Sequence, residues 1–262
     1  MRITTLATVL AIVVLLAGCG RKQPARERGS QPAELLLYCG AGLRPVADEL
    51  IRVFASTHNV KIVTDYAGSE VLLAKMRLVR KGDLYLPGDK YYVDQAVQAN
   101  MVLSHTPVCY FVPTILVQKG NPKDIQSLRD LTRPGLKIGF GDPQACAVGR
   151  ETRHLLDKNH IPWQDIQKNV AFQSLTVNEL GLQIEAKALD AVIVWDAVAK
   201  YYQDDGAEIA IPAAANIFST VDLAVLSCTR KRSLAEQFAQ FAASEQGRAI
   251  FTEHHYTVEL PQ

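Results

Sequence analysis

Apolar positions form short runs and helical stripes that alternate through the first hundred residues. Three short apolar runs have the length and composition of strands, at residues 34–38, 60–65 and 83–86. After each run, apolar side chains recur at three- and four-residue spacing, which is typical of a helix with one buried face. These segments carry Val46, Leu50, Val53 and Phe54, then Leu72, Leu73, Met76 and Val79, and finally residues 90–98. The order βαβαβα predicts a mostly parallel sheet covered by helices on both sides.

The alternation breaks after the third helix. Residues 108–112 and 114–118 are two predicted strands around Pro113 with no helix between them, so we expect the chain to cross there into a second lobe. The pattern then resumes, with predicted strands at 136–140, 170–172, 191–194 and 208–211 and helices at 148–156, 163–168, 177–186 and 195–202. A return strand at 222–227 and closing helices at 233–241 and 245–251 complete it. The fold class is therefore α/β, with lobe 1 built from residues 34–107 plus 213–262, lobe 2 from 108–212, and a cleft between them.

Three loops that follow predicted strands share one composition: small residues, few charges and an immediate helix start. They are residues 39–42, 67–69 and 141–149. In open α/β sheets the ligand lies in the crevice beyond the carboxyl ends of the strands, where these loops are placed. Free N–H groups in the first turn of a helix bind an anion without Lys or Arg, and the hydroxyl of Ser69 adds a donor. The loops therefore predict an anion site, although small residues also occur in plain tight turns.

The first residues have the organisation of an export signal. Arg2 supplies a positive charge, residues 6–16 form an apolar run, and Ala17-Gly18 are small residues at a cleavage point. The run is shorter than the roughly 20 apolar residues of a spanning helix. Leu16-Ala17-Gly18-Cys19 resembles the lipobox of bacterial lipoproteins, so we predict a lipoprotein signal peptide over 1–18 and lipid on Cys19. An ordinary signal peptide with an incidental cysteine, or an uncleaved anchor, remains open. Residues 19–33 are almost devoid of apolar side chains and are interpreted as a flexible tether.

Composition excludes several functions. Lys and Arg number 28 against 27 Asp and Glu, and this balance argues against nucleic acid as a partner. The chain has no G-x-S-x-G, H-E-x-x-H or P-loop motif, and the cysteine spacing matches no zinc pattern. Cys109 and Cys228 lie in apolar runs and are expected to be buried thiols, whereas Cys39 and Cys146 fall in loops placed at the cleft.

Five segments resemble the molybdate- and tungstate-binding proteins that serve ABC importers. They are residues 38–43, 66–69, 83–89, 141–143 with Gly149, and 191–197. The resemblance spans the chain from about residue 34 onward and implies the type II periplasmic-binding-protein fold. It also implies a small inorganic oxyanion as solute, no enzymatic activity, no cofactor or resident metal, and delivery to a membrane permease. The expected protein is a monomer in the cell envelope, held at the membrane surface by its lipid.

The same resemblance implies five ligand-binding residues: Gly42, Ser69, Val148, Val177 and Trp195. Only Ser69 keeps its hydroxyl, because Gly42 replaces the usual Ser and Trp195 replaces the usual Tyr. Two alternatives stay open. One is a protein of the same fold for another anion, such as sulfate, or for a metal ion held by Cys39, Glu70 and Cys146. The other is an enzyme on this scaffold that uses Cys146, Asp142 and a distant histidine.

Overall fold

The computed structural model describes residues 31–260, and every element below belongs to the compact unit Pro32–Gln262. The predicted signal peptide 1–18, Cys19 and all but the end of the tether 19–33 lie outside the described residues. The first strand already begins at Ala33, so this residue belongs to a sheet. Within residues 31–260, no helix combines the length and the apolar character that crossing a membrane requires.

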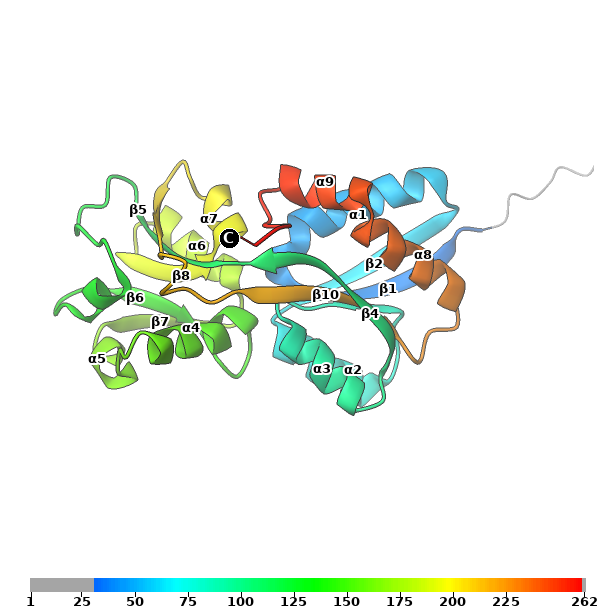
Figure 1. Ribbon diagram of the computed structural model, residues 1–262, viewed down its shortest axis with the longest axis horizontal. Coiled ribbons are helices and arrows are strands. Elements are labelled where there is room, and N and C mark those ends of the chain that lie inside the picture. Colours follow the sequence, from blue (N-terminus) through cyan, green and yellow to red (C-terminus); the bar gives the residue numbers. More distant parts are fainter. Residues whose placement is uncertain (1–30, 261–262) are drawn as a thin grey trace, which may run out of the picture. The chain divides into compact units, whose positions relative to one another are not determined.

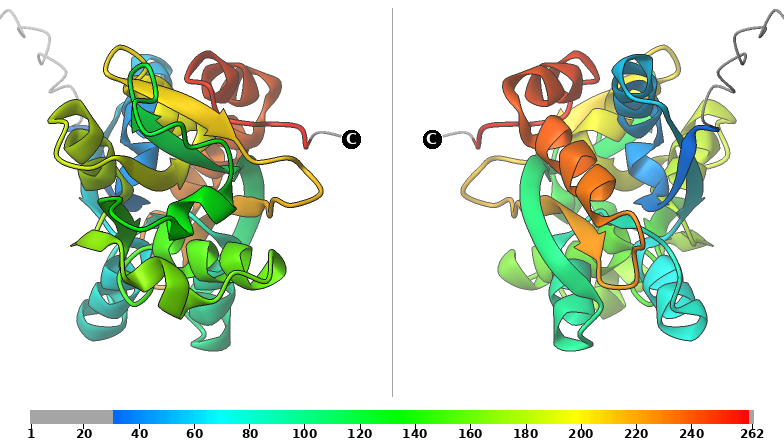
Figure 2. Two further views of the ribbon diagram at one scale, coloured as in Figure 1. Left: turned by 90° about the vertical axis from the view of Figure 1, so that its left-hand side faces the viewer. Right: turned by 90° about the vertical axis from the view of Figure 1, so that its right-hand side faces the viewer.

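The first lobe contains a five-stranded sheet in the order β2-β1-β3-β10-β4. Strands β1, β2 and β3 are parallel, and β10 runs antiparallel to both β3 and β4. The strands are β1 (Ala33–Gly40), β2 (Val60–Ala67), β3 (Leu84–Leu86), β4 (Val102–Phe111) and β10 (Ser219–Leu226). The helices are η1 (Ala41–Leu43), α1 (Arg44–Thr57), α2 (Ser69–Val79), α3 (Lys90–Gln98), α8 (Arg232–Ala243) and α9 (Glu245–Glu253). Both ends of the described chain therefore build this lobe, which faces the viewer in the right view of Figure 2.

The second lobe contains a five-stranded sheet in the order β7-β6-β8-β5-β9. Its strands are β5 (Pro113–Gln118), β6 (Ile138–Gly141), β7 (Val170–Ser174), β8 (Ala191–Trp195) and β9 (Gly206–Ala210). Its helices are η2 (Leu128–Thr132), α4 (Ala147–Lys158), α5 (Trp163–Gln167), α6 (Val177–Glu185) and α7 (Asp196–Tyr201). The central strand β8 is buried along its whole length, as expected for a strand with helices on both faces. Figure 1 shows the two lobes side by side, joined by the paths from β4 to β5 and from β9 to β10.

The chain passes from the first sheet to the second at Val112. Strand β4 runs to Phe111 within the first sheet, so the predicted boundary at 107/108 falls inside this strand, and Val112 alone separates β4 from β5. The first half of β4, including Ser104 and His105, is exposed at the edge of the sheet. An edge strand with polar side chains lacks the apolar run by which a strand is recognised in a sequence.

Candidate solute site

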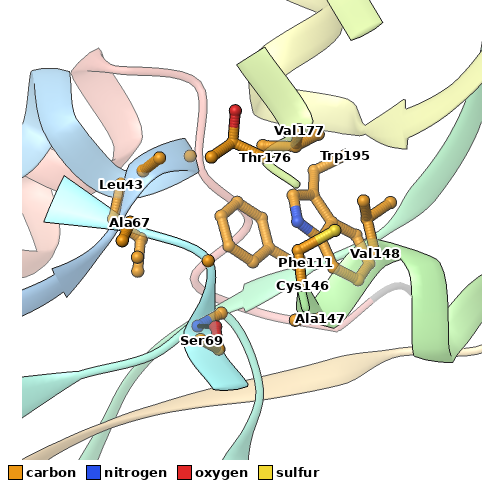
Figure 3. A pocket seen from close by; sticks show the side chains of 15 residues that line it. Leu43, Ala67, Ser69, Phe111, Cys146, Ala147, Val148, Thr176, Val177 and Trp195 are labelled. Carbon is orange, nitrogen blue, oxygen red and sulfur yellow. Dashed lines mark hydrogen bonds between the residues drawn. The ribbon is translucent and has the colours of Figure 1, made fainter. Parts of the chain in front are cut away.

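A small cavity lies where loops of the first lobe meet loops of the second (Figure 3). Its volume is about 20 Å³, comparable to one or two water-sized spheres by the roughly 10–15 Å³ that one water needs. No side chain that lines it is an Asp, Glu, Lys or Arg. The lining residues are Gly40, Ala41, Gly42, Leu43, Ala67, Gly68, Ser69, Gly88, Phe111, Cys146, Ala147, Val148, Thr176, Val177 and Trp195.

Five helical elements begin at this cavity. The residues that precede them are Gly40 before η1, Gly68 before α2, Cys146 before α4, Thr176 before α6 and Trp195 before α7. Each of the five lines the cavity, and none caps its helix with a side-chain hydrogen bond. The first-turn N–H groups of a helix have no partner within the helix and carry the positive end of its dipole. The cavity is therefore a place where electropositive backbone converges without any cationic side chain.

Two helices that begin away from the cavity have side-chain caps. Helix α3 begins after Asp89, whose carboxylate accepts a hydrogen bond from the N–H of Tyr91. Helix α9 begins after Ser244, whose hydroxyl accepts from the N–H of Gly247. Neither Asp89 nor Ser244 lines the cavity. Helices α3 and α9 thus carry capping side chains, which the five helical starts at the cavity lack, as do η2, α5 and α8 elsewhere. At the cavity, the N–H groups of Glu70 and Asp196 donate to backbone carbonyls, and the first-turn N–H groups without such a partner are open to a bound group.

Ser69 is held as a hydrogen-bond donor toward the cavity. Its Oγ accepts from the N–H of Gly88 at 3.0 Å, and its own carbonyl accepts from Tyr85 Oη at 2.9 Å. The side chain is buried. Within residues 31–260 no acceptor is found for the Ser69 hydroxyl proton. The hydroxyl is therefore fixed by the bond that it accepts, and its proton remains for a ligand.

Gly42 packs closely against two residues of the second lobe, Val177 and Trp195. A Cβ atom at Gly42 would lie 2.7 Å from Cγ1 of Val177 and 3.6 Å from Cδ1 of Trp195. The Trp195 ring stacks on Phe111, with ring centroids 4.8 Å apart and planes at 7°. This packing fills the space that a serine side chain would need at position 42. Gly42 offers only its N–H, and the indole edge beside the Trp195 N–H faces it.

The two lobes touch directly around the cavity. The N–H of Glu70 donates to the carbonyl of Ala145 at 3.2 Å. On another side, the Arg150 guanidinium of α4 lies 3.7 Å from the centre of the Tyr91 ring and 3.8 Å from Asp89, both in the first lobe. These contacts join segments on opposite sides of the cleft, so the structure has the cleft closed.

The structure brings all five predicted ligand-binding residues to the same cavity. Gly42 and Ser69 come from the first lobe, and Val148, Val177 and Trp195 come from the second. Their binding role remains a prediction. Sequence reasoning missed Thr176 and Phe111, which also line the cavity. Thr176 directly precedes α6, and a hydroxyl residue before a helical stripe is a signal that would have indicated it.

Two predictions about cysteines are wrong. Cys39 lies in β1, fully buried, with its Sγ donating to the carbonyl of Gly40, and it does not line the cavity. Cys39 is the second-to-last residue of β1 and is part of the buried core, whereas the sequence pattern placed it in the loop after the strand. Cys228 is exposed because it follows the end of β10. Cys109 is buried as expected, and Cys146 does line the cavity.

The described residues do not support the metal alternative. Within 31–260 no group of three or more His, Cys, Asp or Glu side chains is arranged to hold a metal ion. Burial raises the pKa of the Cys146 thiol to about 12 and that of Cys39 well above its usual range. A thiol loses its proton when it binds a metal, and burial makes that loss more costly at both positions.

We predict a pH dependence of stability from Glu151, which lies beside Arg150 at the rim. Burial and the nearby Asp89 carboxylate raise the pKa of Glu151 above its ordinary 4.5. The native state therefore holds this proton more tightly than the unfolded state, so stability falls as pH rises through the interval above 4.5. Glu151→Gln should flatten the fall of the thermal midpoint between mildly acidic and neutral pH. Glu253→Gln, on an exposed helix end, serves as the control; equal slopes in wild type and Glu151→Gln would contradict the prediction.

The fold and the cavity define a two-lobed protein of the type II periplasmic-binding class, in which a solute is enclosed between lobes. Residues 35–257 match the family of bacterial extracellular solute-binding proteins, and the chain belongs to this family. The family is one of binding proteins, so the expectation that the chain is not an enzyme is confirmed, as are the predicted fold class and family.

Individual relatives bind inorganic anions. The molybdate-binding protein ModA of Mycobacterium bovis is 27% identical over 263 residues, covering 95% of this chain and 97% of the relative. The periplasmic molybdate-binding protein of Azotobacter vinelandii superposes with a TM-score of 0.73 at 16% identity, covering 87% of this chain and 100% of that chain. The sulfate-binding protein SubI of Mycobacterium tuberculosis H37Rv superposes with a TM-score of 0.76 at 17% identity, covering 86% of each chain. These two structures share the fold.

Proposed function

We propose that this protein captures a doubly charged tetrahedral oxyanion, molybdate or tungstate, and delivers it to an ABC importer in the membrane. The observation that carries the proposal is the convergence of five helix starts without side-chain caps on a cavity with no charged side chain. The proposed donors are the backbone N–H groups of Gly42, Val148 and Val177, the hydroxyl of Ser69 and the indole N–H of Trp195. No covalent step is involved.

The donors also suggest how the solute is selected. A backbone or indole N–H only donates, so an oxygen that carries a proton meets no acceptor on these groups. A fully deprotonated anion accepts from all of them, whereas a protonated phosphate loses the solvation of its proton when the cleft closes. The cost of that buried, unpaired proton favours aprotic oxyanions. Sulfate satisfies the same rule and is the second candidate, supported by the sulfate-binding relatives.

The experiment that tests this function is a thermal-shift titration of the purified protein with molybdate, tungstate, sulfate and phosphate. A ligand that binds only the native state stabilises it by about 2.7 kcal/mol at 100 times its dissociation constant. We expect molybdate and tungstate to stabilise the protein at the lowest concentrations and phosphate to act least. Stabilisation by Zn²⁺ or Cu(I) with no response to any oxyanion would overturn the proposal in favour of a metal-binding protein.

We further propose that the mature protein is a monomeric lipoprotein of the cell envelope, anchored through Cys19 and linked to the lobes by the residues between Cys19 and β1. The support is the resemblance of residues 16–19 to a lipobox. Lipid on the first residue would hold the protein near the importer while the lobes remain free to bind solute.

Cys19→Ser is expected to leave the protein unprocessed or released from the membrane, because the acceptor of the lipid is lost. The measurement is fractionation of expressing cells into membrane and soluble parts, with tungstate binding checked on the recovered protein. Cys228→Ser, which changes an exposed cysteine far along the chain, is the control. Normal processing and membrane recovery of the Cys19→Ser protein would show that Cys19 is not the anchor.

A further inference from the structure

The chain segment after α9 reaches back to the cavity without lining it. Tyr256 is buried, and its Oη donates to the carbonyl of Gly42 at 2.6 Å. Its ring packs against Phe111, with centroids 5.6 Å apart, and edge-on against Phe251 at 5.8 Å. Tyr256 therefore contacts Gly42 and Phe111, two residues that line the cavity, without lining the cavity itself.

The next residue, Thr257, connects the same segment to the crossing between the lobes. Its carbonyl accepts from the N–H of Tyr110 at 2.7 Å, near the end of β4. Its Oγ1 donates to Oδ2 of Asp196 at 2.7 Å, at the start of α7 in the second lobe. The other carboxylate oxygen of Asp196 accepts from the N–H of Val112 at 3.2 Å. Tyr256 and Thr257 thus bond to η1 of the first lobe, to the end of β4 where the chain crosses between the lobes, and to the start of α7 in the second lobe.

The geometry of Gly42 requires such support. Gly42 lies in the three-residue 3-10 helix η1, which Gly40 precedes without a side-chain cap. Glycine has the greatest backbone freedom of any residue, so the direction of its N–H is fixed only by what surrounds it. The bond from Tyr256 fixes the peptide plane that follows Gly42, and so restricts the backbone torsions of Gly42 that set the direction of its own N–H. Asp196 does the equivalent for its neighbour Trp195, because the N–H of Asp196 also donates to the carbonyl of Val112 at 2.8 Å.

We infer that Tyr256 and Thr257 are positioning residues for the bound solute. They fix the position of the Gly42 N–H in the first lobe relative to the Trp195 indole N–H in the second lobe. The inference rests on the proposed oxyanion function and goes beyond it, because neither residue lines the cavity. Their expected effect is on affinity and on local backbone exchange rather than on the fold.

The first test is Tyr256→Phe, which removes the donor and keeps the ring that packs on Phe111. We expect tungstate to bind about tenfold more weakly, the effect of one lost buried hydrogen bond. Amide hydrogen exchange of residues 41–43 in the solute-free protein should accelerate, while the central strand β8 stays protected. Tyr66→Phe is the matched control, since its hydroxyl bonds Asp48 on the outside of the first lobe. It should change neither quantity.

The second test is Thr257→Val, which cuts the bond to Asp196 and leaves Tyr256 in place. We expect faster dissociation of tungstate, because the second-lobe donor Trp195 is less well held. Wild-type affinity in both variants, or faster exchange spread evenly over the protein, would overturn the inference and leave these residues with a purely structural role. If the wild-type protein binds no oxyanion, the proposed function fails instead. Exchange at residues 41–43 then still decides whether Tyr256 holds Gly42.

Discussion

Gly68→Ala is expected to abolish tight solute binding while leaving the solute-free protein folded. Gly68 has φ −64° and ψ 148°, a conformation open to any L-residue, so alanine causes no backbone strain. Its Cβ, however, would lie 2.4 Å from the carbonyl oxygen of Ala145 and 2.6 Å from that of Leu175. Both oxygens belong to backbone of the second lobe and do not rotate away. The clash is relieved only if the lobes part, which removes the second-lobe donors from the solute.

The expected loss of affinity for molybdate or tungstate is at least about 100-fold, or 2.7 kcal/mol. Calorimetric titration measures it, and the thermal midpoint of the solute-free protein shows that the fold is intact. Gly88→Ala is a graded control: its Cβ would meet the Cβ of Ala147 at 3.2 Å, a milder contact across the same cleft, so a smaller loss is expected. Wild-type affinity in Gly68→Ala would mean that solute binds without the closure seen in this structure.

Ser69→Ala is expected to weaken oxyanion binding by roughly 1–3 kcal/mol, the range for a lost hydrogen bond to a buried charged acceptor. Ser69 is the only hydroxyl among the five proposed ligand-binding residues. The substitution also removes the acceptor for the Gly88 N–H, which loosens the loop that follows β3. The solute-free fold should survive, because Tyr85 still binds the Ser69 carbonyl.

The same calorimetric titration tests this variant. Ser56→Ala provides the matched control, because its hydroxyl is exposed and bonds only the carbonyl of Val53 within α1. An unchanged dissociation constant in Ser69→Ala would show that the solute binds elsewhere or is not an anion. A loss equal for all four anions tested would show that Ser69 supplies affinity without selecting among them.

Hydrophobic periodicity determined most of the fold. The runs at 34–38, 60–65 and 191–194 all became strands, and their helical partners became α1, α2 and α7. A strand buried on both faces reads as a continuous apolar run, and a helix with one buried face reads as a stripe, so each is visible locally. The first half of β4 is exposed and has no continuous apolar run, so the sequence pattern indicated only its second half as a strand. The predicted boundary at 107/108 therefore falls inside β4.

The small-residue loops determined where the candidate site lies. Residues 39–42, 67–69 and 141–149 were expected at one cleft, and each contributes residues to the cavity. Their composition is informative because a helix start that must receive a ligand has no room for side chains and no need of a capping residue. Local sequence therefore indicates which helix starts are open.

Tertiary structure alone decided what closes and supports that site. Nothing in the sequence near Gly68 indicates that Ala145 and Leu175 will press against it, because those contacts join segments that are distant in the chain. Tyr256 follows Gly42 by 214 positions and is its hydrogen-bond partner. Contacts of this kind depend on how two sheets and a crossing are placed in space. The alternation of apolar and polar residues specifies each element, whereas the partner that it meets across the cleft is set only when the whole chain is folded.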